Sequence, residues 1–335
     1  MDTITQFVLG ASVAGVGLGP RLGWRAILVG GVIATLPDLD SFIPYDSPLD
    51  KMTYHRGFTH SLIVQTALSP LIAAGLITFF KNSSLSWQRC WLTVWLCLIT
   101  HSLLDSLTTY GTQLFWPLNV GPPVAFSSVF IIDPFYTILL IIGIIGFLSL
   151  ARKRLSKAVK FCAVLLGLST LYLGLGMSAH LVVQSRAMAL PQLEGTKIHV
   201  QPTPFNILYW QVLAINDKQT FVGVTSVLRT CPIIDFKTYD RFASPSPFQT
   251  SIPQDVKRFE WFTDGFYSYR FTDTGILISD LRIGFAPAYP FTFQFARKSE
   301  GAYVLQKAKR VRQSQRSLAY LQSLYHLAQK VPDGC

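Results

Sequence analysis

Histidine and aspartate residues form three compact clusters in the first third of the chain, each beside an uncharged apolar run. The clusters are Pro37-Asp38-Leu39-Asp40, His55-Arg56-Gly57-Phe58-Thr59-His60 and His101-Ser102-Leu103-Leu104-Asp105. Imidazole nitrogens and carboxylate oxygens are the donors with which proteins bind zinc and other divalent cations. The clusters therefore predict a divalent metal site.

The spacing of the histidines predicts how they reach one point. His101 and Asp105 are four residues apart, so on a helix they project from one face and can share an ion. His55 and His60 are five residues apart and cannot share a helix face. Because Gly57 breaks the chain between them, we expect His55 on a loop and His60 in the first turn of the next helix, both directed into one cavity.

The aspartates supply the oxygen donors. Asp38 and Asp40 flank Leu39 past a helix end and offer two hard ligands to the same space. Asp133 precedes Pro134 and is thereby explained as a helix start. Its alternative role is that of a general base, or of a residue that orients a metal ligand.

Three histidines and up to four aspartates are more donors than one tetrahedral zinc ion requires. This excess favours two ions about 3.5 to 4 Å apart with a bridging carboxylate, a pair that activates water. Zinc is the expected metal and manganese the alternative. Arg56 has two open roles, as a bidentate clamp for a phosphate oxygen and as an anchor at the membrane interface.

The elements that position these residues are membrane segments. Of 335 residues, 50% are hydrophobic and 14% are charged, whereas soluble domains average about 25% charged residues. Six uncharged runs predict six membrane segments: residues 3–20, 26–37, 61–80, 90–100, 134–151 and 161–185. A crossing needs roughly 20 residues, so the second and fourth runs must extend into flanking polar residues.

Basic residues occupy every second short loop, and the positive-inside rule places those loops in the cytoplasm. They are Arg21, Arg25, Lys81, Arg89, Arg152, Lys153, Arg154, Lys157 and Lys160. The loops 37–60 and 105–133, and everything after the sixth segment, then face outward. A re-entrant hairpin in place of the first two crossings would leave this orientation unchanged. We expect a multi-pass membrane protein with an extracytoplasmic C-terminal part.

Beyond residue 190 the apolar periodicity changes to two, as in 275–281 and in Phe291, Phe293 and Phe295. Residues 315–330 space leucines at helical intervals. The predicted fold is thus a mainly α membrane bundle of about six segments, followed by a β-rich domain with a C-terminal helix. The predicted domains are residues 1–189 and 190–335.

The three clusters, in this order, resemble the bacterial YdjM-like family of inner-membrane proteins. Thr109-Tyr110-Gly111-Thr112 and Ile132-Asp133-Pro134 also resemble a branch that carries an extra C-terminal domain. The resemblance covers about residues 1–190 and implies a metal-dependent hydrolase of the bacterial inner membrane. Many members of that family carry a histidine where this chain has Gln6.

The site lies at headgroup level in the predicted topology, which favours a hydrolase acting on an ester or phosphoester of a membrane lipid or lipid-linked substrate. Two other classes remain as alternatives: a cation transporter, and a structural or sensing protein in which the metal only ties helix ends together. The net charge of +11 comes with no nucleic-acid-binding motif, so no nucleic-acid partner is expected. We interpret the positive charge as favouring attraction of the protein to anionic lipid.

Overall fold

The computed structural model describes residues 1–229, 235–242, 253–284, 289–300 and 302–311. The chain folds into two compact units. Unit 1 contains Met1–Ile43 and Arg56–Met177, and unit 2 contains Pro44–His55 and the described part of Ser178–Cys335. The predicted domain boundary at residue 190 stays a prediction, and the helix predicted at 315–330 lies outside the described residues.

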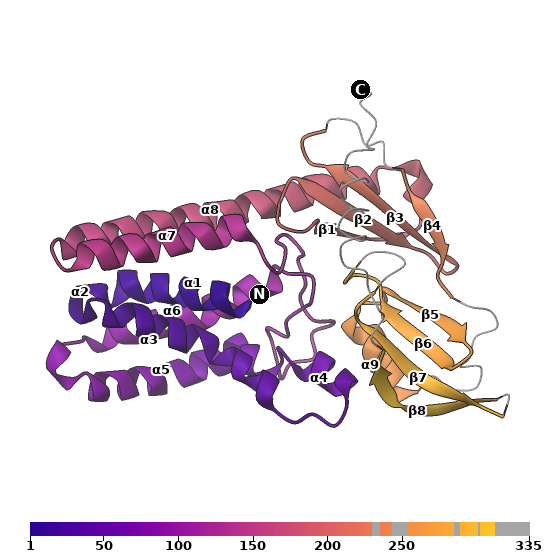
Figure 1. Cartoon of the computed structure of the whole chain (residues 1–335), viewed down its shortest axis with the longest axis horizontal. Helices are drawn as coiled ribbons and strands as arrows, with labels where there is room; N and C mark the ends of the chain where they lie inside the picture. Colours follow the sequence, from indigo (N-terminus) through magenta and orange to yellow (C-terminus); the bar gives the residue numbers. More distant parts are fainter. Residues whose placement is uncertain (230–234, 243–252, 285–288, 301, 312–335) are drawn as a thin grey trace. The chain divides into compact units, whose positions relative to one another are not determined.

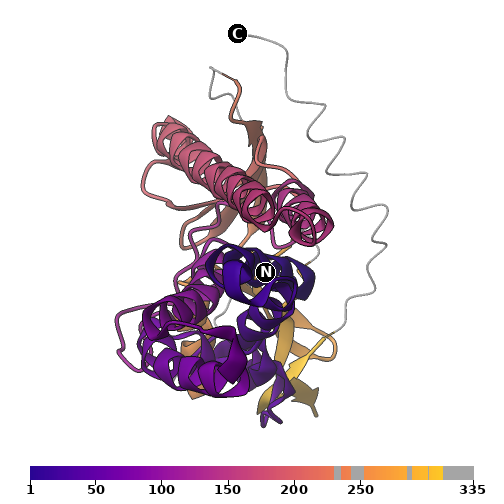
Figure 2. The same ribbon diagram turned by 90° about the vertical axis from the view of Figure 1, so that its left-hand side faces the viewer.

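Unit 1 is a helical bundle, visible from the side in Figure 1 and nearly end-on in Figure 2. Its helices are α1 Thr3–Gly17, α2 Gly19–Leu22, α3 Arg25–Thr35, α5 Leu62–Phe79, α6 Trp87–Ser106, α7 Pro134–Ala151 and the first part of α8 Leu155–Met188. Short 3-10 helices are η1 Pro37–Phe42, η2 Phe58–His60 and η3 Lys81–Ser83. The prediction of a helical N-terminal part is confirmed.

Among the described residues, three helices are long and apolar enough to cross a membrane: α5, α7 and α8. Helices α1 and α3 are apolar but shorter. Helix α6 has 20 residues, but it carries polar side chains such as Thr93, His101 and Asp105 on its buried face. The structure therefore supports three candidate membrane spans where the sequence predicted about six.

Helices α1 and α3 pack backbone against backbone through small residues. A Cβ atom built on Gly10 would lie 2.2 Å from the Ala34 Cβ and 2.4 Å from the Gly30 carbonyl oxygen. Small residues allow this approach between helices in membrane proteins. The packing matters for the site because α1 carries Gln6 and the chain runs from α3 directly into Asp38.

Unit 2 contains two four-stranded antiparallel sheets with strands in sequence order. The first comprises β1 Lys197–Pro202, β2 Tyr209–Ile215, β3 Gln219–Ser226 and β4 Lys237–Asp240. The second comprises β5 Tyr267–Thr272, β6 Gly275–Asp280, β7 Thr292–Ser299 and β8 Ala302–Arg310. The 3-10 helix η4 Pro191–Leu193 precedes β1, and helix α9 Gln254–Phe262 precedes β5. The predicted β-rich C-terminal part is confirmed.

Helix α4, Pro48–Tyr54, comes early in the sequence but packs within unit 2, against α9 and β8. Arg258 of α9 holds it: one guanidinium nitrogen lies 2.6 Å from an Asp50 carboxylate oxygen, and another donates a 2.9 Å hydrogen bond to the Tyr54 hydroxyl. Unit 2 is therefore formed from two separate stretches of the chain.

The close approach of α1 and α3 generates a stability prediction. Gly10→Ala forces the two helices apart, and overpacking of this kind costs about 1–3 kcal/mol. We expect a lower thermal unfolding midpoint for the purified protein in detergent. The matched control is Gly75→Ala in α5, where an added Cβ meets no atom within 4 Å. Equal midpoints for the two variants would contradict this account of the packing.

Candidate metal centre

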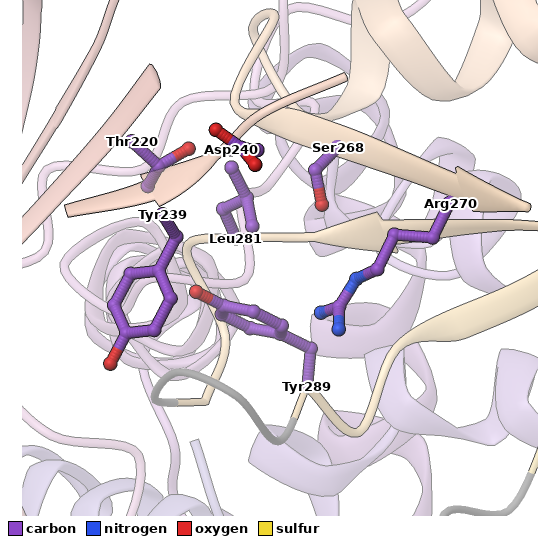
Figure 3. Close-up of a pocket in the computed structure, with 7 residues that line it drawn as sticks. All are labelled: Thr220, Tyr239, Asp240, Ser268, Arg270, Leu281 and Tyr289. Atoms are coloured by element: carbon purple, nitrogen blue, oxygen red, sulfur yellow. The ribbon is translucent and has the colours of Figure 1, made fainter. Parts of the chain in front are cut away.

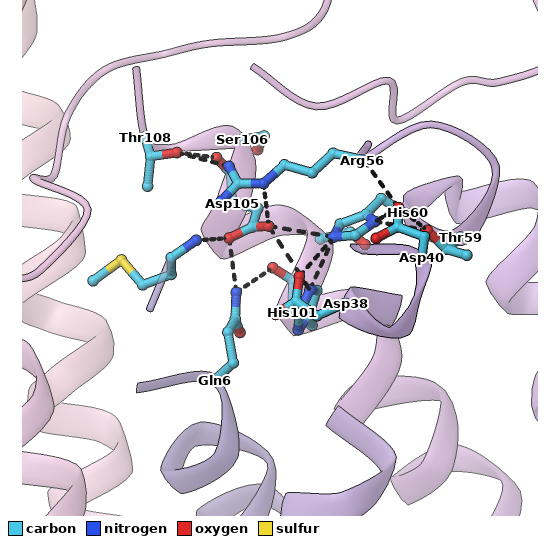
Figure 4. Close-up of polar contacts among 12 residues, drawn as sticks. Gln6, Asp38, Asp40, Arg56, Thr59, His60, His101, Asp105, Ser106 and Thr108 are labelled. Carbon is cyan, nitrogen blue, oxygen red and sulfur yellow. Dashed lines mark hydrogen bonds and ion pairs between the residues drawn. The ribbon is translucent and has the colours of Figure 1, made fainter. Parts of the chain in front are cut away.

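Four of the predicted donors converge at one end of the helical unit (Figure 4). Asp38 of η1, His60 of η2, and His101 and Asp105 of α6 each offer a ligand atom, and these atoms all lie within 4.8 Å of one another. The predicted i, i+4 pair on one helix face is present in α6. His60 lies just before α5 rather than in its first turn, because Ser61 is the N-cap that accepts a hydrogen bond from the Val64 amide.

The distances among the donor atoms match the requirements of a single ion. The Nε2 atoms of His60 and His101 are 3.1 Å apart, and the Asp38 and Asp105 oxygens lie 3.4–3.7 Å from these nitrogens. Donors at about 2.0–2.2 Å from a tetrahedral zinc ion are themselves about 3.3–3.5 Å apart. The distances from the two histidine nitrogens are therefore close to those around a single tetrahedral ion, whereas the donor count in the sequence favoured two.

Burial and charge also favour a cation. His60 and His101 are 0% exposed and Asp105 is 1% exposed, and Oδ2 of Asp105 is buried without a hydrogen bond. The site contains three carboxylates, those of Asp38, Asp105 and the neighbouring Asp40, and two cationic groups, the Arg56 guanidinium and the amino group of Met1, both of which contact Asp105. A divalent cation would offset the remaining negative charge, because charges are rarely buried without compensation.

The charges of the site shift the pKa values of its own residues. Burial by itself raises the pKa of Asp38, but contacts with His101 and His60 outweigh it and hold the pKa well below its usual range. Burial lowers the pKa of His60, whereas Asp105 and Asp38 raise it by more, so the net direction is upward. The surroundings of the His60 ring therefore favour positive charge, and metal binding there would release the ring proton.

Asp40 lies beside the four donors and holds the turn that carries His60. Its Oδ2 accepts hydrogen bonds from the Arg56 amide at 3.1 Å and the Thr59 hydroxyl at 2.8 Å, and it is 3.8 Å from His60 Nδ1. Thr59 also contacts His60 Nδ1 at 3.0 Å. A carboxylate behind a ligating histidine fixes the ring and its tautomer. The structure thus separates Asp40 from Asp38, although the sequence predicted both as ligands.

Arg56 is directed at Asp105. Its Nε lies 3.0 Å from Asp105 Oδ2, its Nη1 donates to Thr108 at 3.2 Å, and its guanidinium lies over the Tyr110 ring. The backbone of Arg56 has φ 62°, a left-handed conformation that is strained for a side-chain-bearing residue. The Asp40 and Asp105 contacts hold this conformation. Neither predicted role of Arg56, phosphate clamp or interface anchor, is tested by these contacts.

Two further predicted residues do not belong to the group of four. His55 caps the end of α4 in unit 2. Asp133, which is fully buried, is the N-cap of α7: it accepts bonds from the Phe135 and Tyr136 amides and from the Tyr172 hydroxyl. Burial raises the pKa of Asp133, and these hydrogen bonds offset part of that rise. The contacts account for Asp133 structurally, and its general-base role stays a prediction.

Two glutamines support the site and were not predicted to do so. Gln6 donates to Asp105 Oδ1 at 2.8 Å and to the His101 carbonyl at 3.2 Å. Gln65 donates to the Thr59 carbonyl at 2.9 Å and to the Ser102 hydroxyl at 2.7 Å. A polar residue inside an uncharged membrane run was the available signal for both, since such residues need a partner.

The fold and the site together define a class of membrane protein. Its helices hold two buried histidines and two aspartates at one end of the bundle, and a β-rich unit follows them. Within that class the chain belongs to the YdjM inner membrane protein family, whose model matches residues 1–182. The resemblance seen in the sequence is thereby confirmed.

Two curated relatives cover part of the same region. The inner membrane protein YbcI of Escherichia coli strain K12 is 36% identical over 118 residues, 35% of this chain and 66% of that protein. The uncharacterized protein YfhP of Bacillus subtilis strain 168 is 32% identical over 142 residues, 40% of this chain and 42% of that protein. The chain thus spans less than two thirds of either relative. No solved structure matches it.

The four-donor geometry predicts about one zinc ion per chain, measured by elemental analysis of the purified protein. His60→Ala or Asp105→Ala should remove most of it, because each deletes a buried donor. Asp133→Asn and His199→Ala are matched controls outside the group and should retain wild-type metal content. Wild-type content in both His60→Ala and Asp105→Ala would refute the assignment.

Proposed function

We propose that the chain is a membrane-bound, metal-dependent hydrolase that cleaves an ester or phosphoester of a lipid or lipid-linked substrate at the outer face of the membrane. The observation that carries the proposal is the convergence of His60, His101, Asp105 and Asp38 at 3.1–3.7 Å spacing. Zinc is the metal that this donor set suits best, with manganese as the alternative.

The four donor side chains differ in solvent exposure, which suggests that they have different roles. His60, His101 and Asp105 are fully buried, whereas the Asp38 side chain is 20% exposed. Catalytic zinc sites commonly have three protein ligands and one open position. We therefore assign the three buried residues as ligands and Asp38 to the solvent side, where its carboxylate accepts a proton from the attacking water.

A bound zinc ion would supply Lewis acidity, lowering the pKa of water and polarising the scissile group. Neighbouring side chains of the protein orient the metal ligands. Asp40 and Thr59 hold the Nδ1 side of His60, and Arg56 and Gln6 hold the two oxygens of Asp105. We infer that Arg56 acts chiefly by positioning Asp105 and offsetting its charge, since its guanidinium already contacts that carboxylate.

The lipid part of the proposal rests on apolar side chains in the same short turns. Leu39 and Phe42 of η1 and Phe58 of η2 are 52–82% exposed, while Asp40 and His60 of these turns are buried. Phe58 packs edge-on against Trp116 with ring centroids 5.2 Å apart. Exposed aromatic and apolar groups around a polar site are typical of surfaces at a membrane interface.

The outer location rests on the distribution of basic residues among the loops. We expect a periplasmic-type reporter fused after residue 190 to be active and a cytoplasmic-type reporter at the same position to be silent. Fusions after Arg154, in a basic loop, should give the opposite pattern. Cytoplasmic reporter activity after residue 190 would overturn the outer-face assignment.

Hydrolysis is tested with zinc-loaded protein in detergent or liposomes, incubated with phospholipids, lipid-linked phosphates and simple phosphodiesters. We expect turnover that chelation abolishes and zinc restores. His60→Ala should lose it entirely, and Asp38→Asn should lower it roughly 100-fold, within the usual contribution of a general base. His199→Ala should retain wild-type turnover. Absence of chelator-sensitive turnover across the panel would refute the proposal.

A structural or sensing metal site is the second candidate, because four protein donors are also the number found in closed structural zinc sites. Asp38→Asn distinguishes the two. In the hydrolase, the three remaining ligands keep the metal and only turnover falls. In a closed site, Asp38 is a ligand, so the same substitution lowers metal content and the thermal unfolding midpoint together.

A further inference from the structure

Unit 2 contains a cavity of about 210 Å³ between its two sheets (Figure 3). The described residues that line it are Thr220, Tyr239, Asp240, Ser268, Arg270, Leu281 and Tyr289. The two sheets are joined beside it by a shared apolar cluster that includes Leu213 and Ile215 of β2 with Phe266, Leu281 and Tyr289. The cavity is therefore built from packed strands of both sheets.

Thr220 leaves a polar atom in this cavity without a partner. The residue is 2% exposed, and its Oγ1 makes no hydrogen bond. Burial of an unpaired hydroxyl is unfavourable. Ser268 beside it is also buried, at 4% exposure. Both residues line the cavity.

The lining also includes two exposed residues of opposite charge, Arg270 and Asp240. The described residues provide no hydrogen bond or ion pair to the side chain of Arg270 or Asp240. In contrast, Arg282 is paired with Asp280 at 2.9 Å and Lys197 with Asp264 at 2.7 Å. In Figure 3 the Arg270 guanidinium points toward the Tyr289 ring, and the Asp240 carboxylate lies beside Thr220.

We propose that this cavity binds a small zwitterion, with its anionic group on the Arg270 guanidinium and its ammonium group on the Asp240 carboxylate. Guanidinium is suited to a carboxylate or phosphate, and Ser268 adds a hydroxyl group to the lining of the same cavity. Pockets for drug-sized ligands are about 300–1,000 Å³. The volume here suits a molecule such as a free amino acid or phosphoethanolamine and is too small for an acyl chain.

This site is separate from the metal centre, since it shares no residue with Asp38, His60, His101 or Asp105. It gives the β-rich unit a recognition function of its own. The proposal does not depend on hydrolysis, and its test has a binding readout.

The test is equilibrium binding to the purified full-length protein in detergent, with L-alanine and phosphoethanolamine as zwitterionic probes. Propionate and inorganic phosphate carry the anionic group alone, and ethanolamine carries the ammonium group alone. We expect saturable binding of one zwitterion, at least about 10-fold tighter than that of its single-charge counterparts, because each charged contact contributes a factor of that order. The zwitterion that binds shows whether the anionic group of the ligand is a carboxylate or a phosphate.

Substitutions of Arg270 and Asp240 test the two charged contacts one at a time. Arg270→Gln should weaken the bound zwitterion at least about 10-fold, and Asp240→Asn should abolish the preference for the zwitterion over its anion. Arg297→Gln, at an exposed arginine of β7, is the matched control and should bind normally. Thermal unfolding midpoints equal to wild type verify that the variants are folded.

Two results would overturn the proposal. One is the absence of saturable binding of either zwitterion below about 10 mM, which is weaker than small-molecule sites usually require. The other is binding that folded Arg270→Gln protein retains at wild-type strength.

Discussion

The arrangement of side chains in the candidate metal centre of unit 1 depends on the contacts that stabilise the buried Asp105 carboxylate. A carboxylate that is 1% exposed at the end of a membrane-domain helix is unfavourable unless opposite charge and hydrogen bonds surround it. Gln6 of α1, Arg56 before η2 and His60 within η2 all contact its oxygens. Two segments far apart in the sequence, α1 and the Arg56–His60 turn, are thereby fixed around one side chain of α6, and the candidate metal ligands come together as a consequence.

The aspartates show what the sequence could and could not predict about the site. Asp38, His60, His101 and Asp105 were all predicted, because ionisable residues in apolar surroundings are few and their spacing on α6 is helical. Asp38 and Asp40 could not be told apart, since both follow the same helix end. Only the turn of η1 directs Asp38 to the donors and Asp40 to the Arg56 amide. The left-handed backbone of Arg56 has no sequence signature in a residue of this type.

The fold was predictable where a single periodicity dominates. All six uncharged runs fall on helices, and the period-two stretches at 275–281 and 291–295 fall on β6 and β7. The number of membrane spans was less predictable, because an apolar run indicates burial without saying whether lipid or protein covers it. Gly10 and Gly30 show that α1 and α3 bury apolar surface against each other, so their short lengths suit protein contact as well as lipid.

Composition also could not show that helix α4 belongs to unit 2. The shift in charge near residue 190 suggests one boundary, whereas the chain leaves unit 1 at Ile43 and returns to it at Arg56. The Arg258 contacts with Asp50 and Tyr54 that hold α4 are side-chain interactions across more than two hundred residues of sequence. Because η1 precedes α4 in the sequence and η2 follows it, both turns of the candidate metal centre are covalently tied to a helix packed in the β-rich unit. The chain therefore connects the two units through the segments that flank α4, as well as through α8.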